Sequence, residues 1–112
     1  EEAVLGFAPE LAFSGPLETL SDEVVDHLLA TLREALSNVA RHAAARSVRV
    51  GIDVTDNVCL VVDDDGVGLP VPPPTGSGLV NMAERAAGLG GTMDIEGRTT
   101  RGTRVTWRVP RA

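Results

Sequence analysis

The stretch Leu32–His42, L-R-E-A-L-S-N-V-A-R-H, decides the fold, because a helix here carries both a core face and a polar face. At about 100° per residue, Glu34, Asn38 and Arg41 fall within a narrow arc of an α-helix. The roughly opposite arc is apolar and is made of Leu28, Leu32, Ala35, Leu36, Val39 and Ala43. This pattern predicts a helix that packs its back on a core and presents an acid, an amide and a cation at its front.

The segments on either side of this helix predict a mixed α/β domain. Ser21 or Asp22 can cap the helix, which we expect to run from residue 23 to residue 44. A second helix is predicted over 79–87, with Leu79, Met82, Ala83 and Ala86 at core spacing. Strands are predicted over 10–19, 47–55, 58–63, 92–96 and 102–109, and the Gly-Pro interruption at Pro16 makes the first an edge strand or a strand with a turn. Strands outnumber helices and most connections are short, so we expect an α+β two-layer sandwich. Its sheet would be mixed and mostly antiparallel, with the helices on one face.

Length and composition restrict the class of protein. The 112 residues suit one domain, which we place at 10–112 after a tail of a preceding segment at 1–9. A net charge of −6 and only three aromatic residues, one of them Trp107, argue against general nucleic-acid or membrane binding. The single Cys59 excludes an internal disulfide and is read as a small buried hydrophobe. No apolar run is long enough to cross a bilayer, so we expect a cytoplasmic domain.

The polar front of the first helix has the chemistry of a magnesium site. Mg²⁺ prefers oxygen ligands, and Asn38 offers its amide oxygen. Glu34, one turn earlier, could hold a metal-bound water or act as a base, and Arg41 could pair with a phosphate. His42 lies at the edge of this face. Taken alone, the spacing also fits an ordinary solvated helix face, and that reading is then the better one.

A second motif, D-D-G-V-G, ends an apolar strand at 64–68. Gly66 and Gly68 allow a tight turn and a close approach of the backbone to a ligand. The carboxylate of Asp64 could accept a hydrogen bond from an exocyclic amine such as that of adenine. An acidic turn or a weak cation site are the alternatives. An EF-hand is excluded, because the twelfth position counted from Asp63 is Pro74.

A third motif, Gly76-Ser77-Gly78-Leu79, enters the second helix. Free N–H groups at a helix start, with no side chains in the way, favour an anion. A flexible linker and cap are the alternative. The fingerprints of Rossmann and P-loop nucleotide sites are absent. Four prolines between the second and third motifs indicate a short, stiff loop, so we expect weak nucleotide binding and easy exchange.

The order of these three motifs resembles that of bacterial sensor histidine kinases. R-E-A-L-S-N-V-A-R-H is similar to the N box, D-D-G-V-G to the first glycine box and G-S-G-L to the second. The resemblance covers about 17–109 and is closest to the NarX, DesK and DevS/DosT-like branch, which pairs with NarL-type response regulators. The implied fold is the Bergerat (GHKL) ATP-binding sandwich shared with gyrase and MutL.

The resemblance implies a role for each candidate residue, with ATP and Mg²⁺ as cofactors. Asn38 would ligate Mg²⁺, and Glu34 would position a metal-bound water or act as a base, so these two are the candidate catalytic residues. Asp64 would accept from the adenine amino group. The nucleotide site implied as a whole comprises Asn38, Arg41, His42, Asp64, Gly66, Gly68, Gly76, Ser77, Gly78, Leu79 and Thr103.

The chain lacks the phospho-accepting histidine of this family, which stands in a separate dimerisation helix and is followed by an acid. His27 and His42 are followed by Leu28 and Ala43. We therefore expect a protein histidine kinase catalytic domain that is monomeric alone and presents the γ-phosphate to a partner domain. The alternatives are a GHL-type ATPase, an anti-sigma serine kinase, or a degenerate nucleotide-binding docking module.

Overall fold

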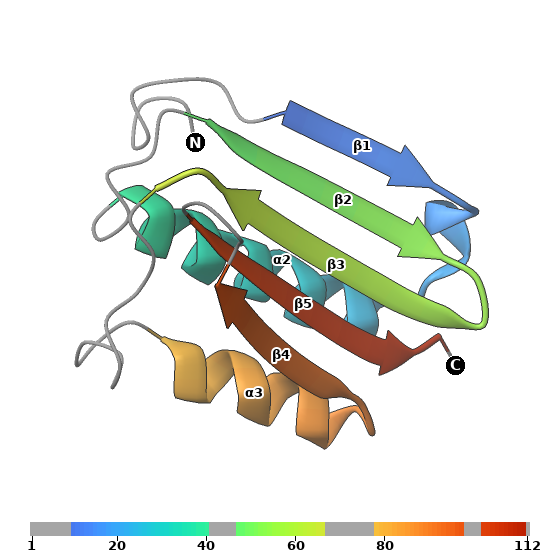
Figure 1. The fold of residues 1–112 in the computed structure, drawn as a ribbon. Helices are drawn as coiled ribbons and strands as arrows, with labels where there is room; N and C mark the ends of the chain where they lie inside the picture. The colour runs from blue at the N-terminus through green and yellow to red at the C-terminus, as the bar shows by residue number, and fades with distance from the viewer. Residues whose placement is uncertain (1–9, 41–46, 67–77, 98–101, 112) are drawn as a thin grey trace.

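A computed structural model describes residues 10–40, 47–66, 78–97 and 102–111. It contains one five-stranded sheet of order β1-β2-β3-β5-β4, with helices α2 and α3 on one face (Figure 1). The elements are β1 (Glu10–Ser14), η1 (Leu17–Thr19), α2 (Asp22–Asn38), β2 (Val48–Val54), β3 (Asn57–Asp64), α3 (Leu79–Gly88), β4 (Thr92–Gly97) and β5 (Thr103–Pro110). The predicted two-layer α+β sandwich is confirmed.

The sheet is mixed, as predicted. The edge strand β1 runs parallel to β2, and the pairs β2–β3, β3–β5 and β4–β5 are antiparallel. The strand predicted over 10–19 is an edge strand and is interrupted at Gly15-Pro16, as the sequence indicates, but it does not resume: β1 ends at Ser14 and a short 3-10 turn follows. Gly15 has φ +91°, and a Cβ there would overlap the carbonyl oxygen of Val54. Pro16 next to it has no N–H to continue a ladder.

Helix α2 begins as the sequence predicts. The Ser21 side chain accepts a hydrogen bond from the Val24 N–H at 3.2 Å, and Asp22 and Glu23 lie in the first turn. Its α-helical part ends at Asn38, earlier than predicted, and Val39 and Ala40 continue as a π-type turn. Residues 41–46, over which the helix was predicted to end, lie outside the described part of the chain.

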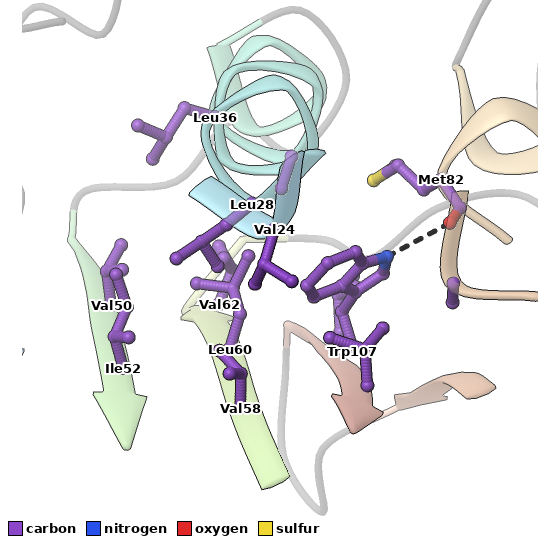
Figure 2. Close-up of a cluster of buried hydrophobic side chains, with 14 of the residues drawn as sticks. Val24, Leu28, Leu36, Val50, Ile52, Val58, Leu60, Val62, Met82 and Trp107 are labelled. Carbon is purple, nitrogen blue, oxygen red and sulfur yellow. Dashed lines mark hydrogen bonds between the residues drawn. The ribbon is translucent and has the colours of Figure 1, made fainter. Parts of the chain in front are cut away.

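The core lies between the sheet and the two helices. Alternate residues of β2, β3 and β5 point toward the helices, and their apolar members are all buried: Val48, Val50, Ile52, Val54, Val58, Leu60, Val62, Val105, Trp107 and Val109. The Trp107 ring is fully buried and its Nε1–H donates to the Met82 carbonyl of α3 at 3.1 Å (Figure 2). This bond fixes α3 against β5 at the centre of the core.

Two sequence-based expectations about burial are wrong. Cys59 is only half-buried, because the strand period places it on the sheet face that carries no helix. Ala83, which was expected at a core position of the second helix, is exposed. Helix α3 covers only the edge of the sheet formed by β5 and β4, so few of its residues are buried: Leu79, Met82 and Ala86.

Candidate functional site

Four chain segments meet at one end of the sandwich. The last turn of α2, the end of β3, the start of β5 and the start of α3 all lie on the left in Figure 1. Antiparallel pairing of β3 with β5 brings this about, because Asp63 at the end of β3 is opposite Arg104 at the start of β5. The segments that carried the three sequence motifs are therefore neighbours, although they are far apart along the chain.

Asn38 is the most unusual side chain of this end. It is 5% exposed, yet neither its amide nitrogen nor its amide oxygen has a hydrogen-bond partner among the described residues. An unpaired buried amide costs on the order of 1–3 kcal/mol. The observation places a donor and an acceptor in the interior with nothing from the described chain to satisfy them.

Asp64 lies at the end of β3 and is also 5% exposed. Its Oδ1 accepts a hydrogen bond from the Gly66 N–H at 2.8 Å. Burial raises the pKa of this carboxyl above its usual value of 3.8, and the nearby charges of Asp63 and Asp65 raise it further. Hydrogen bonds from the backbone of Gly66 and Thr103 oppose the shift. The second motif thus forms an oriented carboxyl held in a partly dry environment.

The start of β5 lies directly against the backbone of Asp64. Gly102 has φ +102°, and a Cβ there would overlap the Asp64 carbonyl oxygen and lie 3.1 Å from the Asp65 Cα. Only glycine fits at this contact without a shift of the backbone. Thr103, the next residue, is buried at 5% exposure beside Asp64. Thr103 is a candidate nucleotide-binding residue in the sequence only because of the family resemblance.

A hollow joins these groups. Its cavity volume is about 10 Å³, and the space reaches about 300 Å³ only when the open solvent at its mouth is included. It is lined by Ala35, Asn38, Val39, Val62, Asp64, Thr103 and Val105. Four of these residues are aliphatic and three are polar. Apolar walls with a few fixed polar groups suit a flat heteroaromatic ring, whose faces are apolar and whose edge makes hydrogen bonds. The helix period predicts Ala35 and Val39 on the core face, because such a period does not distinguish a pocket wall from a core contact.

Glu34 lies outside the group of residues that line the hollow, although it precedes Asn38 by one turn. Its carboxylate lies instead against Gly78 at the start of α3, where a Cβ on Gly78 would overlap Oε2. Leu79, the first residue of α3, is buried. The structure therefore brings together Asn38, Asp64, Gly66 and Thr103 in one group and Glu34, Gly78 and Leu79 in another.

Five candidate residues cannot be located in this geometry. Arg41, His42, Gly68, Gly76 and Ser77 lie outside the described residues. Within the described ranges, no group of three or more His, Cys, Asp or Glu side chains could hold a metal ion. No helix in those ranges has the length and apolarity needed to span a membrane.

Comparisons with known proteins identify relatives of this arrangement. The family model "Histidine kinase-, DNA gyrase B-, and HSP90-like ATPase" matches residues 23–112. Sensor histidine kinase LnrJ of Bacillus subtilis is 38% identical over 99 residues, which are 87% of this chain and 24% of the relative. The nitrate/nitrite sensor protein NarX of Escherichia coli is 35% identical over 106 residues, which are 92% of this chain and 18% of NarX.

A solved structure agrees with this fold. The ATP-binding domain of PrrB from Mycobacterium tuberculosis matches with a TM-score of 0.71 and 23% identity, over 99% of this chain and 87% of that one. The relatives with similar sequences are much longer, since the chain spans less than a quarter of LnrJ and of NarX. The chain thus corresponds to one domain of such proteins.

Proposed function

Because this chain belongs to the family of histidine kinase-, DNA gyrase B- and HSP90-like ATPases, and has the ATPase domain of sensor histidine kinases, we propose that it binds ATP with Mg²⁺ for phosphoryl transfer. The acceptor would be a histidine of a separate dimerisation domain in the same two-component signalling kinase. The single observation that carries the proposal is the buried amide of Asn38, which has no hydrogen-bond partner within residues 10–40, 47–66, 78–97 and 102–111.

The hollow supports adenine as the base. Its aliphatic residues, such as Val62 and Val105, would lie against the faces of the purine, while Asp64 would accept from the exocyclic amine. Hydrogen bonds from the backbone of Gly66 and Thr103 keep this carboxyl in place before any ligand arrives. Such preorganisation lowers the entropic cost of binding.

The residues present also fit Mg²⁺ bound together with phosphates. Mg²⁺ keeps several waters and commonly takes one or two protein oxygens plus phosphate oxygens, so a cluster of carboxylates is not required. Asn38 would supply the amide oxygen, and the metal when bound would supply charge neutralisation of the triphosphate. Arg41, His42, Gly68, Gly76 and Ser77 are proposed as further nucleotide contacts on the strength of their motifs alone.

Calorimetric titration of this 112-residue chain with ATP, with and without Mg²⁺, tests the proposal. Asn38→Ala and Asp64→Asn should each weaken ATP binding by about 10- to 100-fold, since a hydrogen bond to a charged group contributes about 1.5–3 kcal/mol. Asn57→Ala and Asp94→Asn, at exposed positions of β3 and β4, are the matched controls and should bind as the unsubstituted chain does. Unchanged affinity in both site variants would overturn the proposal in favour of a degenerate docking module.

A second experiment tests whether the histidine that accepts the phosphate lies in a separate domain. With γ-labelled ATP, the chain alone should acquire no label, because His27 and His42 lie within the ATP-binding segment and lack the acid that follows the acceptor in this family. Label should appear on an added histidine-bearing dimerisation domain of the parent kinase, which would act on a NarL-type response regulator in the cytoplasm. Label on the isolated chain would contradict this assignment. Rapid ATP hydrolysis lost in Glu34→Gln would favour the GHL-type ATPase.

A further inference from the structure

The outer side of strand β1 is uncovered. β1 is an edge strand that pairs with β2 alone among the described strands (Figure 1). All five of its residues are exposed. An edge strand offers a row of N–H and C=O groups to another extended chain, and native edge strands are commonly protected from this by lysine, proline or a bulge. The stretch Glu10–Ser14 contains neither lysine nor proline, and Glu10 is its one charged residue.

β1 also carries two large apolar side chains that the helices leave uncovered. Leu11 and Phe13 are 53% and 57% exposed. Their partners in the parallel ladder are Val50 and Ile52, which are buried under the helix layer. Directly opposite residues share a face of the sheet, so Leu11 and Phe13 extend the apolar helix side of the sheet beyond the helices. An open edge flanked by exposed apolar side chains is the surface to which an extended segment binds by adding a strand.

A row of charges with alternating sign crosses the sheet face that carries no helix. In register from β1 to β4, acid and base alternate as Glu10, Arg49, Asp63, Arg104 and Glu96. Glu10 Oε2 accepts from Arg49 Nε at 3.2 Å, and Asp63 Oδ2 accepts from the Arg104 guanidinium at 3.0 Å. Opposite charges on directly opposed residues stabilise a strand pair, and like charges destabilise it. A strand beside β1 would therefore continue the row best with a lysine or arginine opposite Glu10.

The other edge of the sheet, β4, is less suited to a new strand. Two acids, Asp94 and Glu96, lie there on the face of the charge row, where they protect the edge. On the helix side of β4, Met93 is half-buried and Ile95 is 41% exposed, which is less than either apolar side chain of β1. The two edges thus differ, and β1 is the one that combines an open backbone with an apolar surface.

We propose that β1 is a docking edge for an extended segment of a partner protein, which adds a strand antiparallel to β1. The segment would place apolar residues opposite Phe13 and Leu11, with a small residue between them, and a basic residue opposite Glu10. Read from its amino end, it has the pattern apolar, small, apolar, basic. Antiparallel pairing is chosen because it is slightly more stable per residue than parallel pairing.

Two observations separate this inference from its neighbours. None of the residues that line the hollow belongs to β1, so the docking edge does not rest on the proposed function. A second copy of the chain fits the edge less well, because Glu10–Ser14 contains no basic residue to place opposite Glu10. The charge row thus favours a partner with a basic residue over self-association.

Amide NMR spectra of the 112-residue chain, titrated with a short synthetic peptide, test the proposal. The peptide has Val-Thr-Val-Lys at its centre, between glycines. It should shift the amide signals of Glu10–Ser14 and slow their hydrogen exchange. A second peptide with Val-Thr-Val-Glu should bind about two- to fivefold more weakly, the factor expected for one exposed cross-strand charge pair. In Glu10→Lys the order of the two peptides should reverse.

Variants on the two edges provide matched controls. Phe13→Ser should weaken binding of the lysine peptide by about tenfold, because it removes an apolar contact, while Ile95→Ser on β4 should leave it unchanged. Circular dichroism checks that both variants fold, and Phe13→Ser should bind ATP as the unsubstituted chain does. Failure of ATP binding in the unsubstituted chain would therefore leave this inference standing.

Three results would overturn the docking edge. These are unshifted β1 signals at millimolar peptide, shifts confined to β4, and equal affinities for the lysine and glutamate peptides. A shift of the β1 signals with chain concentration, in the absence of peptide, would assign the edge to a second copy and would overturn it as well.

Discussion

The body of helix α2 and its last turn differ in the polar group that they bury. The body buries Val24 and Leu28 against the sheet, and the one polar residue buried there, Thr31, donates its hydroxyl to the His27 carbonyl at 2.8 Å. Its last turn buries Asn38, whose amide has no partner among the described residues. Figure 2 shows Val24 and Leu28 above Trp107 and the β3 valines.

This difference separates stability from function within one helix. In the body of the helix every described buried group is apolar or hydrogen-bonded, so the packing there lowers the free energy of the fold. At the last turn, the Asn38 amide, which has no partner in the described part of the chain, and the neighbouring, partly desolvated carboxyl of Asp64 raise it. Buried polar groups that destabilise a fold are often found where a ligand forms hydrogen bonds with them. For this reason the end that contains Asn38 and Asp64 is the proposed binding end.

The largest expected effect belongs to the packed end. Trp107→Ala removes a fully buried ring and its hydrogen bond to Met82, and should lower the free energy of unfolding by about 3–5 kcal/mol. Urea unfolding followed by far-ultraviolet circular dichroism measures this change. Trp107→Phe is the matched control and should lose less, because it keeps most of the apolar surface. A loss under about 1 kcal/mol for Trp107→Ala would contradict the central role of this contact.

At the end that contains Asn38, a substitution should instead raise the free energy of unfolding. Asn38→Leu replaces an amide that no described residue pairs with by an apolar side chain of similar size, in a wall shared with Ala35 and Val39. Without nucleotide, the free energy of unfolding should rise by about 1–3 kcal/mol, the cost of the unsatisfied groups. ATP binding should be lost in the same variant. Destabilisation of the nucleotide-free chain would mean that Asn38 has partners in the folded protein.

The Asp64 carboxyl should make the free energy of unfolding depend on pH. Its pKa is raised in the fold, mainly by burial, so the folded state holds this proton more tightly than the unfolded state does. The resulting stability is present below 3.8, the usual value, and is lost as the pH rises through the raised pKa of the folded state. Relative to Asp64→Asn, the unsubstituted chain should therefore lose free energy of unfolding as the pH rises through this interval.

Unfolding curves at closely spaced pH values measure this difference. Asp94→Asn is the control, because Asp94 is exposed on β4 and its removal should leave the pH dependence nearly unchanged. A loss of stability in the unsubstituted chain as the pH falls, relative to Asp64→Asn, would contradict desolvation as the dominant cause.

The sequence predicts the layers of this fold better than it predicts the site. Alternation in β2 and β5 and the apolar arc of α2 depend on local periods, and the structure buries the alternate apolar residues of both strands and most of that arc. The opposite arc of the helix predicts Asn38 beside Glu34 on one polar front. The structure instead turns Asn38 into the hollow, while Glu34 reaches α3. That division depends on where β5 and α3 lie, which no local period encodes.

The smallest expected effect concerns a buried polar group that already has a hydrogen-bond partner. It tests whether the loss of stability comes from the missing partner of Asn38 or from burial itself. Thr31→Val, seven residues before Asn38 on the same helix, removes a fully buried hydroxyl that already has a partner in the His27 carbonyl. It should cost at most about 1 kcal/mol, since a neutral hydrogen bond contributes about that much and the bond to the preceding turn slightly weakens helices. The two sites are roughly 10 Å apart along the helix, so Thr31→Val and Asn38→Leu should add in the double variant. A gain from Thr31→Val as large as that from Asn38→Leu would show that burial of a polar group, and not the absence of a partner, sets the cost at both ends.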